Sequence, residues 1–286
     1  MANIAVLLAK GRTFSFEFFP PKSDAEQQTL ARTLHELEPL GPSFVSVTYR
    51  GGPASRRRTF DLVAGMRHTT TLTPMAHLIC VAHSRLELAE ILVAYRKAGV
   101  ENLMALGGDP PTDPEDGPGE LRYASELVEL ARAIGGFSIG VAAHPAGHLL
   151  SPDLPSDRDH LAEKLRLADF AVTQFFFEPD AYTGLVTDLA DRGVDTPVLP
   201  GIMPVTTLAS VPRMATMGAA VPGWMVERLQ AADAAGGPDA VRHTGVEIAT
   251  ELCEKLLASG VPGLHFYTLN RSSATREIYH ALGLGG

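Results

Sequence analysis

Glu17 is the residue whose type and surroundings most directly suggest acid–base chemistry. Phe14, Phe16 and Phe18 alternate with polar residues around it, which predicts a β-strand that ends at the following prolines. A carboxylic acid among phenylalanines is costly to ionise, so we expect burial to raise the pKa of Glu17. A raised pKa suits a general acid that keeps its proton near neutral pH. The competing interpretation is a glutamate at the edge of a strand, with its carboxylate in water.

Four more polar side chains lie at or just past the ends of segments that the sequence predicts to be strands; these are Thr48, Asp109, His144 and Gln174. With Glu17 they supply an acid, a second carboxylate, a hydroxyl, an imidazole and an amide. Such a set suits the orientation of a heterocycle and the movement of a proton. The sequence has no Ser-His-Asp or Cys-His signature and no Walker phosphate loop, so it does not indicate covalent catalysis.

His144 and His148 are four residues apart, a spacing that can serve a metal ion when it lies on a helix. Pro145 lies between them and argues against a helix that presents both rings to one ion. The two cysteines, Cys80 and Cys253, have no paired spacing that would indicate a zinc site or a disulfide framework. We therefore expect no metal.

Strand-like and helix-like segments alternate along nearly the whole chain, and these elements must position the polar side chains. The alternation predicts an α/β fold, a (β/α)8 TIM barrel that forms a single catalytic domain over residues 1–286. A doubly wound sheet is the competitor, but no G-x-G-x-x-G follows any predicted strand. In a barrel the C-terminal ends of the strands form one mouth, where the polar residues would meet. Strands are expected at 14–18, 44–48, 74–80, 102–106, 137–143, 170–176, 197–200 and 264–268.

Composition and charge restrict the partners. The 286 residues carry a formal net charge of −9, which argues against nucleic acid or an anionic membrane as the main partner. No apolar stretch approaches the length of a membrane span, and the apolar run at 4–9 is too short for the core of a signal peptide. We expect a cytoplasmic enzyme that acts on a small molecule and forms a homo-oligomer.

Seven short motifs occur in order along the chain: Phe16-Glu17-Phe18-Phe19-Pro20-Pro21-Lys22, Val45-Ser46-Val47-Thr48-Tyr49, Gly108-Asp109-Pro110-Pro111, Tyr123-Ala124-Ser125-Glu126-Leu127, Thr173-Gln174-Phe175-Phe176-Phe177, Pro200-Gly201-Ile202-Met203-Pro204-Val205 and His265-Phe266-Tyr267-Thr268-Leu269-Asn270-Arg271. Over about residues 14–284 the chain closely resembles bacterial 5,10-methylenetetrahydrofolate reductase. The resemblance implies a (β/α)8 barrel with FAD. It implies reduction of 5,10-methylenetetrahydrofolate to 5-methyltetrahydrofolate by NAD(P)H with ping-pong kinetics, in one-carbon metabolism and methionine biosynthesis.

The resemblance also implies roles for individual residues. Glu17 matches the acid that helps to open the five-membered ring of the folate, and Asp109 matches a carboxylate near the flavin and the pterin. Gln174 matches a residue that contacts both folate and nicotinamide, and Arg271 matches a folate contact that suits the glutamate tail. The positions that match the flavin site are Thr48, Tyr49, His77, Gly108, Asp109, Ala124, His148, Asp157 and Lys164, and Gly107 and His144 occupy two further positions there.

Some contacts of the family are replaced in this chain. Gly107 stands where the family usually has an arginine that contacts the flavin phosphates, and His144 stands where a tyrosine commonly stacks near the flavin. Ser210 stands where some relatives have a folate-contacting glutamine, and we expect it to bind substrate. Met214 stands where some relatives have a phenylalanine that stacks on nicotinamide. Candidate replacements for the missing arginine are Arg56, Arg57 and Arg58.

Three alternatives to the flavin-dependent reductase stay open. The first is direct hydride transfer from NAD(P)H to the same folate, without flavin. The second is a different barrel oxidoreductase that acts on a related pterin with a deazaflavin or flavin. The third is a non-catalytic barrel that binds folate or a partner.

Overall fold

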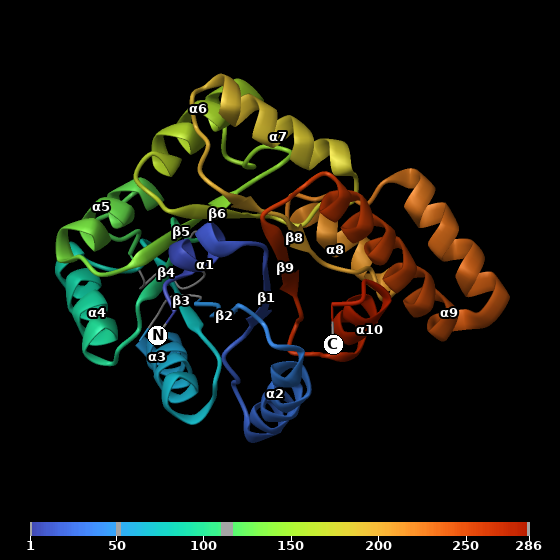
Figure 1. The fold of residues 1–286 in the computed structure, drawn as a ribbon, viewed down its shortest axis with the longest axis horizontal. Helices are drawn as coiled ribbons and strands as arrows, with labels where there is room; N and C mark the ends of the chain where they lie inside the picture. The colour runs from blue at the N-terminus through green and yellow to red at the C-terminus, as the bar shows by residue number, and fades with distance from the viewer. Residues whose placement is uncertain (1, 50–52, 110–116, 285–286) are drawn as a thin grey trace.

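The computed structural model describes residues 2–49, 53–109 and 117–284, and parallel strands form its centre (Figure 1). The strands are β1 (Thr13–Phe18), β2 (Phe44–Val47), β3 (Pro74–Ile79), β4 (Asn102–Leu106), β5 (Ser138–Ala143), β6 (Phe170–Thr173), β7 (Val198–Leu199), β8 (Gly201–Ile202) and β9 (Gly263–Tyr267). Neighbouring strands hydrogen-bond in the order β7-β6-β5-β4-β3-β2-β1-β9-β8. The two ends of this order, β7 and β8, are consecutive in the chain, so the sheet closes on itself as a barrel.

The expected (β/α)8 barrel is confirmed, and the strand expected at 197–200 is divided in two. Pro200 has no N–H to donate, and it separates β7, which pairs with β6, from β8, which pairs with β9. The carbonyl of Pro200 accepts a hydrogen bond from the backbone N–H of His265 at 3.0 Å. The two short pieces therefore fill one position of the ring together.

Helices cover the outside of the sheet (Figure 1). They are α1 (Ile4–Lys10), α2 (Asp24–Leu37), α3 (Pro53–Thr69), α4 (Arg85–Lys97), α5 (Ala124–Ile134), α6 (Leu154–Leu165), α7 (Pro179–Asp191), α8 (Val211–Thr216), α9 (Gly223–Ala258) and α10 (Ser273–Ala281), with 3-10 turns at Glu38–Leu40 and Leu208–Ser210. Ser23 and Ser84 cap α2 and α4 by accepting hydrogen bonds from backbone N–H groups of the first turn. Within the described residues, no helix is both long and apolar enough to cross a membrane.

The short helix α1, which the sequence pattern does not indicate, covers the N-terminal end of the barrel. The backbone N–H of Ile4 donates to Oδ1 of Asn102 at 2.9 Å, and that of Ala5 donates to Oγ of Ser138 at 3.0 Å. The Ile4 side chain is fully buried in an apolar cluster that includes Phe44. This end of the barrel is therefore filled, and chemistry is left to the opposite, C-terminal end.

The two faces of β1 have opposite environments. Phe16 packs outward, with its ring centroid 5.2 Å from that of Tyr279 in α10. Phe18 belongs to the same apolar layer between the sheet and the helices. Successive side chains of a strand point to opposite faces, so Ser15 and Glu17 face the interior of the barrel.

Candidate active site

Glu17 is a nearly buried carboxylate in the interior of the barrel, with 9% of its surface exposed. Its Oε2 atom lies 3.4 Å from Oγ of Ser46 on β2, which donates a hydrogen bond to it. The same oxygen lies 3.5 Å from Nε2 of His77 on β3 and 3.7 Å from Nε2 of His265 on β9. Side chains from three neighbouring strands thus converge on a single carboxylate oxygen.

The pKa of Glu17 lies below its ordinary value, so the expectation of a raised pKa is wrong. Burial does act to raise the pKa, but the hydrogen bond with His265, the charges of His77 and His265 and the Ser46 hydroxyl together outweigh it. The phenylalanines that motivated the expectation occupy the other face of β1. Burial lowers the pKa of His77, against the opposing effect of Glu17. Near pH 7 the pair is therefore an ionised carboxylate beside a neutral imidazole.

His265 links Glu17 to a second hydroxyl on the same face of β1. Oγ of Ser15 lies 2.8 Å from Nδ1 of His265, while Nε2 of that ring faces Glu17. Tyr267 packs edge-on against the His265 ring, and its hydroxyl donates to the carbonyl of Thr173 at 2.6 Å. The His265 ring thus lies between the Ser15 hydroxyl, which it contacts through Nδ1, and the Glu17 carboxylate, which its Nε2 faces at 3.7 Å.

The importance of Ser15, Ser46 and His265 is not evident from the alternation of β1 alone. In the sheet, Ser15 lies opposite His265 and Glu17 lies opposite Ser46. A signal for these residues does exist in the sequence, because His265 and Ser46 each lie between apolar residues in a predicted strand. What the sequence lacks is the register that sets these strands side by side.

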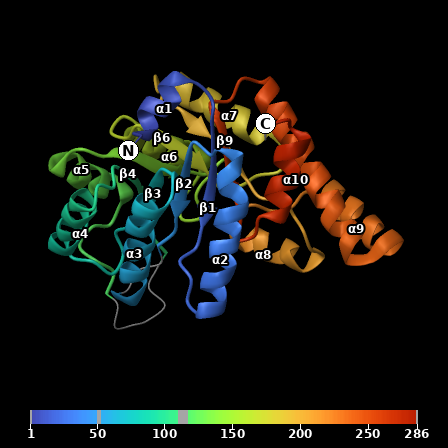
Figure 2. The ribbon, with the colours of Figure 1, turned by 60° about the horizontal axis from the view of Figure 1, so that its bottom comes forward.

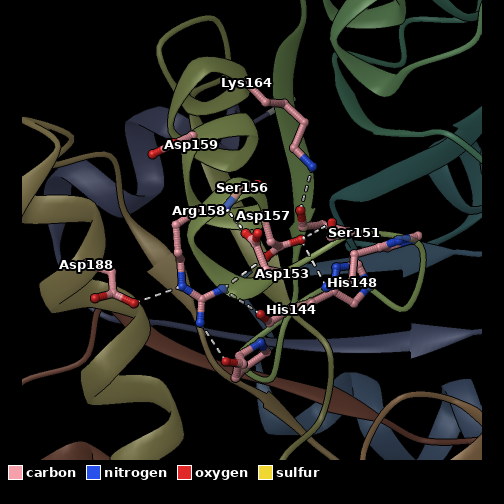
Figure 3. A network of polar contacts seen from close by, with 12 residues as sticks. His144, His148, Ser151, Asp153, Ser156, Asp157, Arg158, Asp159, Lys164 and Asp188 are labelled. Carbon is pink, nitrogen blue, oxygen red and sulfur yellow. Dashed lines mark hydrogen bonds and ion pairs between the residues drawn. The ribbon is translucent and has the colours of Figure 1, made fainter.

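A second polar cluster lies beyond β5 and at the start of α6 (Figure 3). Asp157 accepts hydrogen bonds at Oδ1 from the backbone N–H of His148, at 2.9 Å, and from the hydroxyl of Ser151, at 3.0 Å. The rings of His144 and His148 meet edge to face, with their centroids 4.8 Å apart. Burial lowers the pKa of His144 to about 4, so this ring is neutral at pH 7.

Lys164 places an ammonium group in the same region. Its Nζ donates to the carbonyl of Ala142 at 2.8 Å (Figure 3). Burial lowers its pKa to about 8, against the opposing charge of Asp157. An ammonium has three N–H donors, and within the described residues the structure gives this one hydrogen bond for Lys164, which leaves donors for an anion. The sequence-predicted group His144, His148, Asp157 and Lys164 is therefore brought together.

Arg158, which the sequence analysis did not select, holds this cluster in place. Its side chain is only 3% exposed, and Nη1 lies 3.0 Å from Oδ2 of Asp157 while Nε lies 3.1 Å from Oδ2 of Asp188 on α7. It also donates to the backbone carbonyls of His144, at 2.9 Å, and Pro145, at 2.6 Å (Figure 3). One buried guanidinium thus fixes the segment that carries both histidines. In the sequence, Arg158 lies among polar residues at the start of a helix, where a solvent-exposed arginine is the usual interpretation. The sequence therefore has no signal that this side chain is buried.

Asp109 and Gln174 lie past the ends of β4 and β6, as expected, but the described residues show no hydrogen bond or ion pair between either of them and Glu17. Asp109 is exposed. The Gln174 amide donates to the carbonyl of Met217 at 3.1 Å and accepts from the N–H of Phe175 at 3.0 Å. Its roles toward folate and nicotinamide stay predictions.

The two glycines before Asp109 differ in what they permit. Gly108 has φ +90°, and an added Cβ would lie 3.1 Å from Cβ of Ile79, so a side chain there would be strained and crowded. Around Gly107, apart from its chain neighbours, no residue that the structure describes has an atom within 4 Å of an added Cβ. The described residues therefore leave space for a β-carbon at Gly107, the position at which the resemblance implies an arginine.

The remaining predicted residues are spread around the same end of the barrel. Oγ1 of Thr48 is buried without a hydrogen-bond partner in the described part of the chain. The hydroxyl of Tyr49 lies 2.6 Å from Nε2 of His83, inside the apolar layer. Ser210 donates to the carbonyl of Thr207 at 2.6 Å, and Ala124 begins α5. Within the described ranges, no group of three or more His, Cys, Asp and Glu side chains could hold a metal ion.

Comparisons with known proteins agree with one another. The model of the family described as methylenetetrahydrofolate reductase matches residues 3–283. The 5,10-methylenetetrahydrofolate reductases of Pectobacterium carotovorum subsp. carotovorum and Escherichia coli (strain K12) are each 35% identical to the chain over 272 residues, which is 94% of this chain and 90% of each relative. Methylenetetrahydrofolate reductase 1 of Schizosaccharomyces pombe is 35% identical over 279 residues, which is 95% of this chain but 46% of that protein.

A solved structure shares the fold at much lower identity. It is an uncharacterized protein from Clostridium thermocellum that binds two copies of 5-methyl-5,6,7,8-tetrahydrofolic acid. The two structures align with a TM-score of 0.67 and 12% identity over 97% of each chain. This likeness supports the barrel architecture.

Proposed function

The chain belongs to the methylenetetrahydrofolate reductase family, and from this premise we propose that Glu17 and the two imidazoles around it handle the proton of folate reduction. As a member of the family, the chain is an oxidoreductase of folate one-carbon metabolism. The observation that carries the proposal is the nearly buried Glu17 carboxylate within 4 Å of His77 and His265.

In the proposed reaction, Glu17 delivers a proton to N10 of 5,10-methylenetetrahydrofolate. Protonation makes N10 a better leaving group, so the bond between N10 and the methylene carbon breaks and a 5-iminium cation remains. A hydride added to the methylene carbon then gives 5-methyltetrahydrofolate. A negative charge at Asp109 favours the cationic iminium.

Glu17 must hold a proton before it can donate one. A pterin lying over the carboxylate excludes water and increases its burial, which acts to raise its pKa. Nε2 of His265 faces Oε2 of Glu17 at 3.7 Å, and Ser15 keeps that ring oriented through the bond to Nδ1. The imidazoles thus set the environment of the carboxylate, and Glu17 is the group that meets the folate.

The residues at the mouth fit a cofactor that carries phosphates. Lys164 has spare N–H donors at a buried position, and the buried Thr48 hydroxyl lacks a partner in the described ranges. We therefore propose that Thr48, His148 and Lys164 help to hold FAD, with Arg158 fixing the segment that carries His148. When bound, reduced FAD would supply the hydride. NAD(P)H and folate would then use the same face in turn, which gives ping-pong kinetics.

Three further expectations remain proposals. Gln174, Ser210 and Arg271 are proposed to contact folate, the first of them also nicotinamide. Residues 1–286 are proposed to form one catalytic domain. A homo-oligomer in the cytoplasm is proposed from the likeness to the family alone, and light scattering on the purified protein tests the oligomer.

The colour and turnover of the purified protein test the function. We expect a yellow protein that NADH bleaches and that methylenetetrahydrofolate or menadione reoxidises. Colourless protein that still oxidises NADH with the folate would support direct hydride transfer without flavin. Colourless protein that is inert in both assays would support a non-catalytic binding barrel, and either of these results would contradict the flavin-dependent proposal.

A further inference from the structure

The segments that follow β1 and β9 are joined by side chains just beyond the last paired residues of the two strands. In the sheet, Glu17 lies opposite Tyr267, at the C-terminal ends of both strands. Pro20 and Pro21 have no N–H group, so backbone donors cannot extend the pairing of β1 beyond Phe19 at this point. Figure 2 shows α2 and α10, the helices that follow the two strands, side by side.

Asn270 binds the end of β1 through both groups of its side-chain amide. Its Oδ1 accepts a hydrogen bond from the backbone N–H of Phe19 at 2.8 Å, and its Nδ2 donates to the carbonyl of Phe19 at 2.9 Å. The amide therefore pairs with the backbone as a neighbouring strand would, at a place where β9 has already ended. Phe19 is two residues from Glu17, so this contact fixes the path of the chain just past the carboxylate.

Thr268 holds the backbone of Glu17 itself. Its buried hydroxyl donates to the carbonyl of Glu17 at 2.6 Å and accepts from the backbone N–H of Asn270 at 3.2 Å. A hydroxyl that donates and accepts at the same time cannot rotate without losing one of the two bonds. Thr268 and Asn270 thus restrain β1 at Glu17 and again two residues later.

The turn that presents these two side chains is strained. Leu269 and Asn270 have φ of 52° and 56°, and the N–H of Arg271 donates to the carbonyl of Thr268 at 2.9 Å, which is the pattern of a type I′ turn. Asparagine tolerates this left-handed conformation, but leucine rarely adopts it. Such a conformation persists only where the surrounding contacts enforce it, and the hydroxyl of Thr33 on α2 adds one by donating to the carbonyl of Asn270 at 2.9 Å.

We propose that Asn270 and Thr268 are positioning residues that hold the Glu17 carboxylate at the point from which it serves the folate. The proposal rests on the proposed function, because it takes Glu17 as the acid. Both side chains act on the backbone, and β1 passes the restraint on to the carboxylate. Proton transfer needs its donor and acceptor within hydrogen-bond reach, so a displaced carboxylate transfers its proton more slowly.

The contacts of the carboxylate itself show why a backbone restraint is needed. Oε2 of Glu17 lies 3.4 Å from Ser46, 3.5 Å from His77 and 3.7 Å from His265, which is longer than typical hydrogen bonds. Contacts of this length hold a side chain weakly. The shorter bonds that Thr268 and Asn270 make to the backbone of β1 therefore fix the position of the carboxylate more firmly than its own neighbours do.

The test separates the folate half-reaction, which needs the acid, from NADH oxidation with menadione, which does not. In Asn270→Gly the backbone keeps a conformation that glycine favours, whereas the side-chain contacts with Phe19 are lost. We expect reoxidation of the reduced enzyme by methylenetetrahydrofolate to slow by about 10- to 100-fold, while the activity with menadione stays within about twofold of wild type.

A double variant shows whether Asn270 acts through Glu17. When Asn270→Gly is added to Glu17→Gln, the folate half-reaction should slow by less than about twofold further, because the group that Asn270 positions is already missing. A residue that only stabilises the fold would lower the rate by the same factor in both backgrounds.

Two further comparisons separate positioning from a general loosening of the segment. Thr268→Val removes the hydroxyl at nearly constant size and should slow the folate half-reaction, whereas Thr268→Ser keeps the hydroxyl and should retain most of the rate. This pair decides the question if Asn270→Gly does not fold. Ser272→Ala is the matched control, since it breaks the contact of the same segment with Glu36 on α2 and leaves the contacts with β1 in place; it should keep both activities.

Each contrary outcome identifies what has failed. Equal loss of both activities in Asn270→Gly, the same loss of folate rate in Ser272→Ala, or a full additional loss in the double variant would overturn the positioning role. Unchanged folate rates in Asn270→Gly and Thr268→Val, beside a slow Glu17→Gln, would overturn this inference and leave the proposed function intact. Folate reduction by Glu17→Gln at the wild-type rate would overturn both.

Discussion

Oε2 of Glu17 lies 3.7 Å from Nε2 of His265, across the pairing of β1 with β9. The imidazole is one of the groups that hold the pKa of Glu17 below its ordinary value. Because Ser15 holds the far side of the ring at 2.8 Å, the carboxylate and the imidazole keep a fixed relation. The acid strength of Glu17 is therefore set by its neighbours on β2, β3 and β9 as much as by burial.

Replacement of His265 by Asn should raise the pKa of Glu17, because it removes a hydrogen bond and a charge that favour the ionised form. A step that needs protonated Glu17 is lost as pH rises through its pKa. The pH–rate profile of the folate half-reaction should therefore have its alkaline limb at higher pH in His265→Asn, although the maximum rate of this variant falls. Stopped-flow reoxidation of the reduced enzyme by folate across pH measures this. Ser15→Ala keeps the imidazole and should move the limb less; an unmoved limb in His265→Asn would contradict the role of the ring.

Binding of FAD should weaken as pH rises past about 8, because Lys164 has a pKa of about 8 and a phosphate favours its charged form. Above that pH, binding must take up a proton, so the dissociation constant should rise by up to about tenfold per pH unit. Fluorescence of released flavin reports the constant. Lys164→Met should bind FAD more weakly at neutral pH, and its dissociation constant should not change with pH in this way. Lys97 is exposed, and Lys97→Met should bind FAD as the wild type does. The same dependence in Lys164→Met would exclude Lys164 as its source.

Introduction of an arginine at Gly107 should tighten the binding of FAD. Apart from its chain neighbours, no described residue has an atom within 4 Å of a Cβ added at this position, and a guanidinium can pair with a phosphate through two hydrogen bonds. We expect the dissociation constant of Gly107→Arg to fall about tenfold, as a pair of this kind contributes roughly 1–2 kcal/mol. Gly108→Ala is the contrasting variant, since its Cβ would crowd Ile79 and its φ is +90°. Unchanged affinity in Gly107→Arg would show that the phosphates lie elsewhere.

Loss of the buried guanidinium of Arg158 should destabilise the fold. Arg158→Leu leaves the nearly buried Asp157 without its ion-pair partner and two backbone carbonyls without a donor. We expect the free energy of unfolding to fall by about 3–5 kcal/mol. Urea denaturation followed by circular dichroism measures it. The matched control is Arg192→Leu, which breaks the more exposed pair with Asp159 across the same two helices and should cost about 1 kcal/mol or less; equal losses in the two variants would remove the special role of Arg158.

The sequence pattern was sufficient for the barrel because alternation of strand and helix is a local property that each segment carries by itself. It predicted Glu17, Thr48, Asp109, His144 and Gln174 at the mouth for the same reason. It was insufficient for the environment of Glu17, which depends on the register that sets Ser46 and His265 beside it. The phenylalanines next to Glu17 in the chain are not its neighbours in space. Arg158 escaped notice because its partners come from α7 and from backbone carbonyls.

The separate half-reactions of Glu17→Gln test the central claim most directly, because they divide the proton-dependent step from the step that needs no acid. The glutamine keeps the size of the side chain but cannot donate a carboxylic proton. We predict that reoxidation of the reduced enzyme by methylenetetrahydrofolate slows by about 10²–10⁴-fold, while NADH oxidation with menadione as acceptor stays within about twofold of wild type. Equal loss of both activities, or folate reduction at the wild-type rate, would contradict the assignment of Glu17 as the acid that meets the folate.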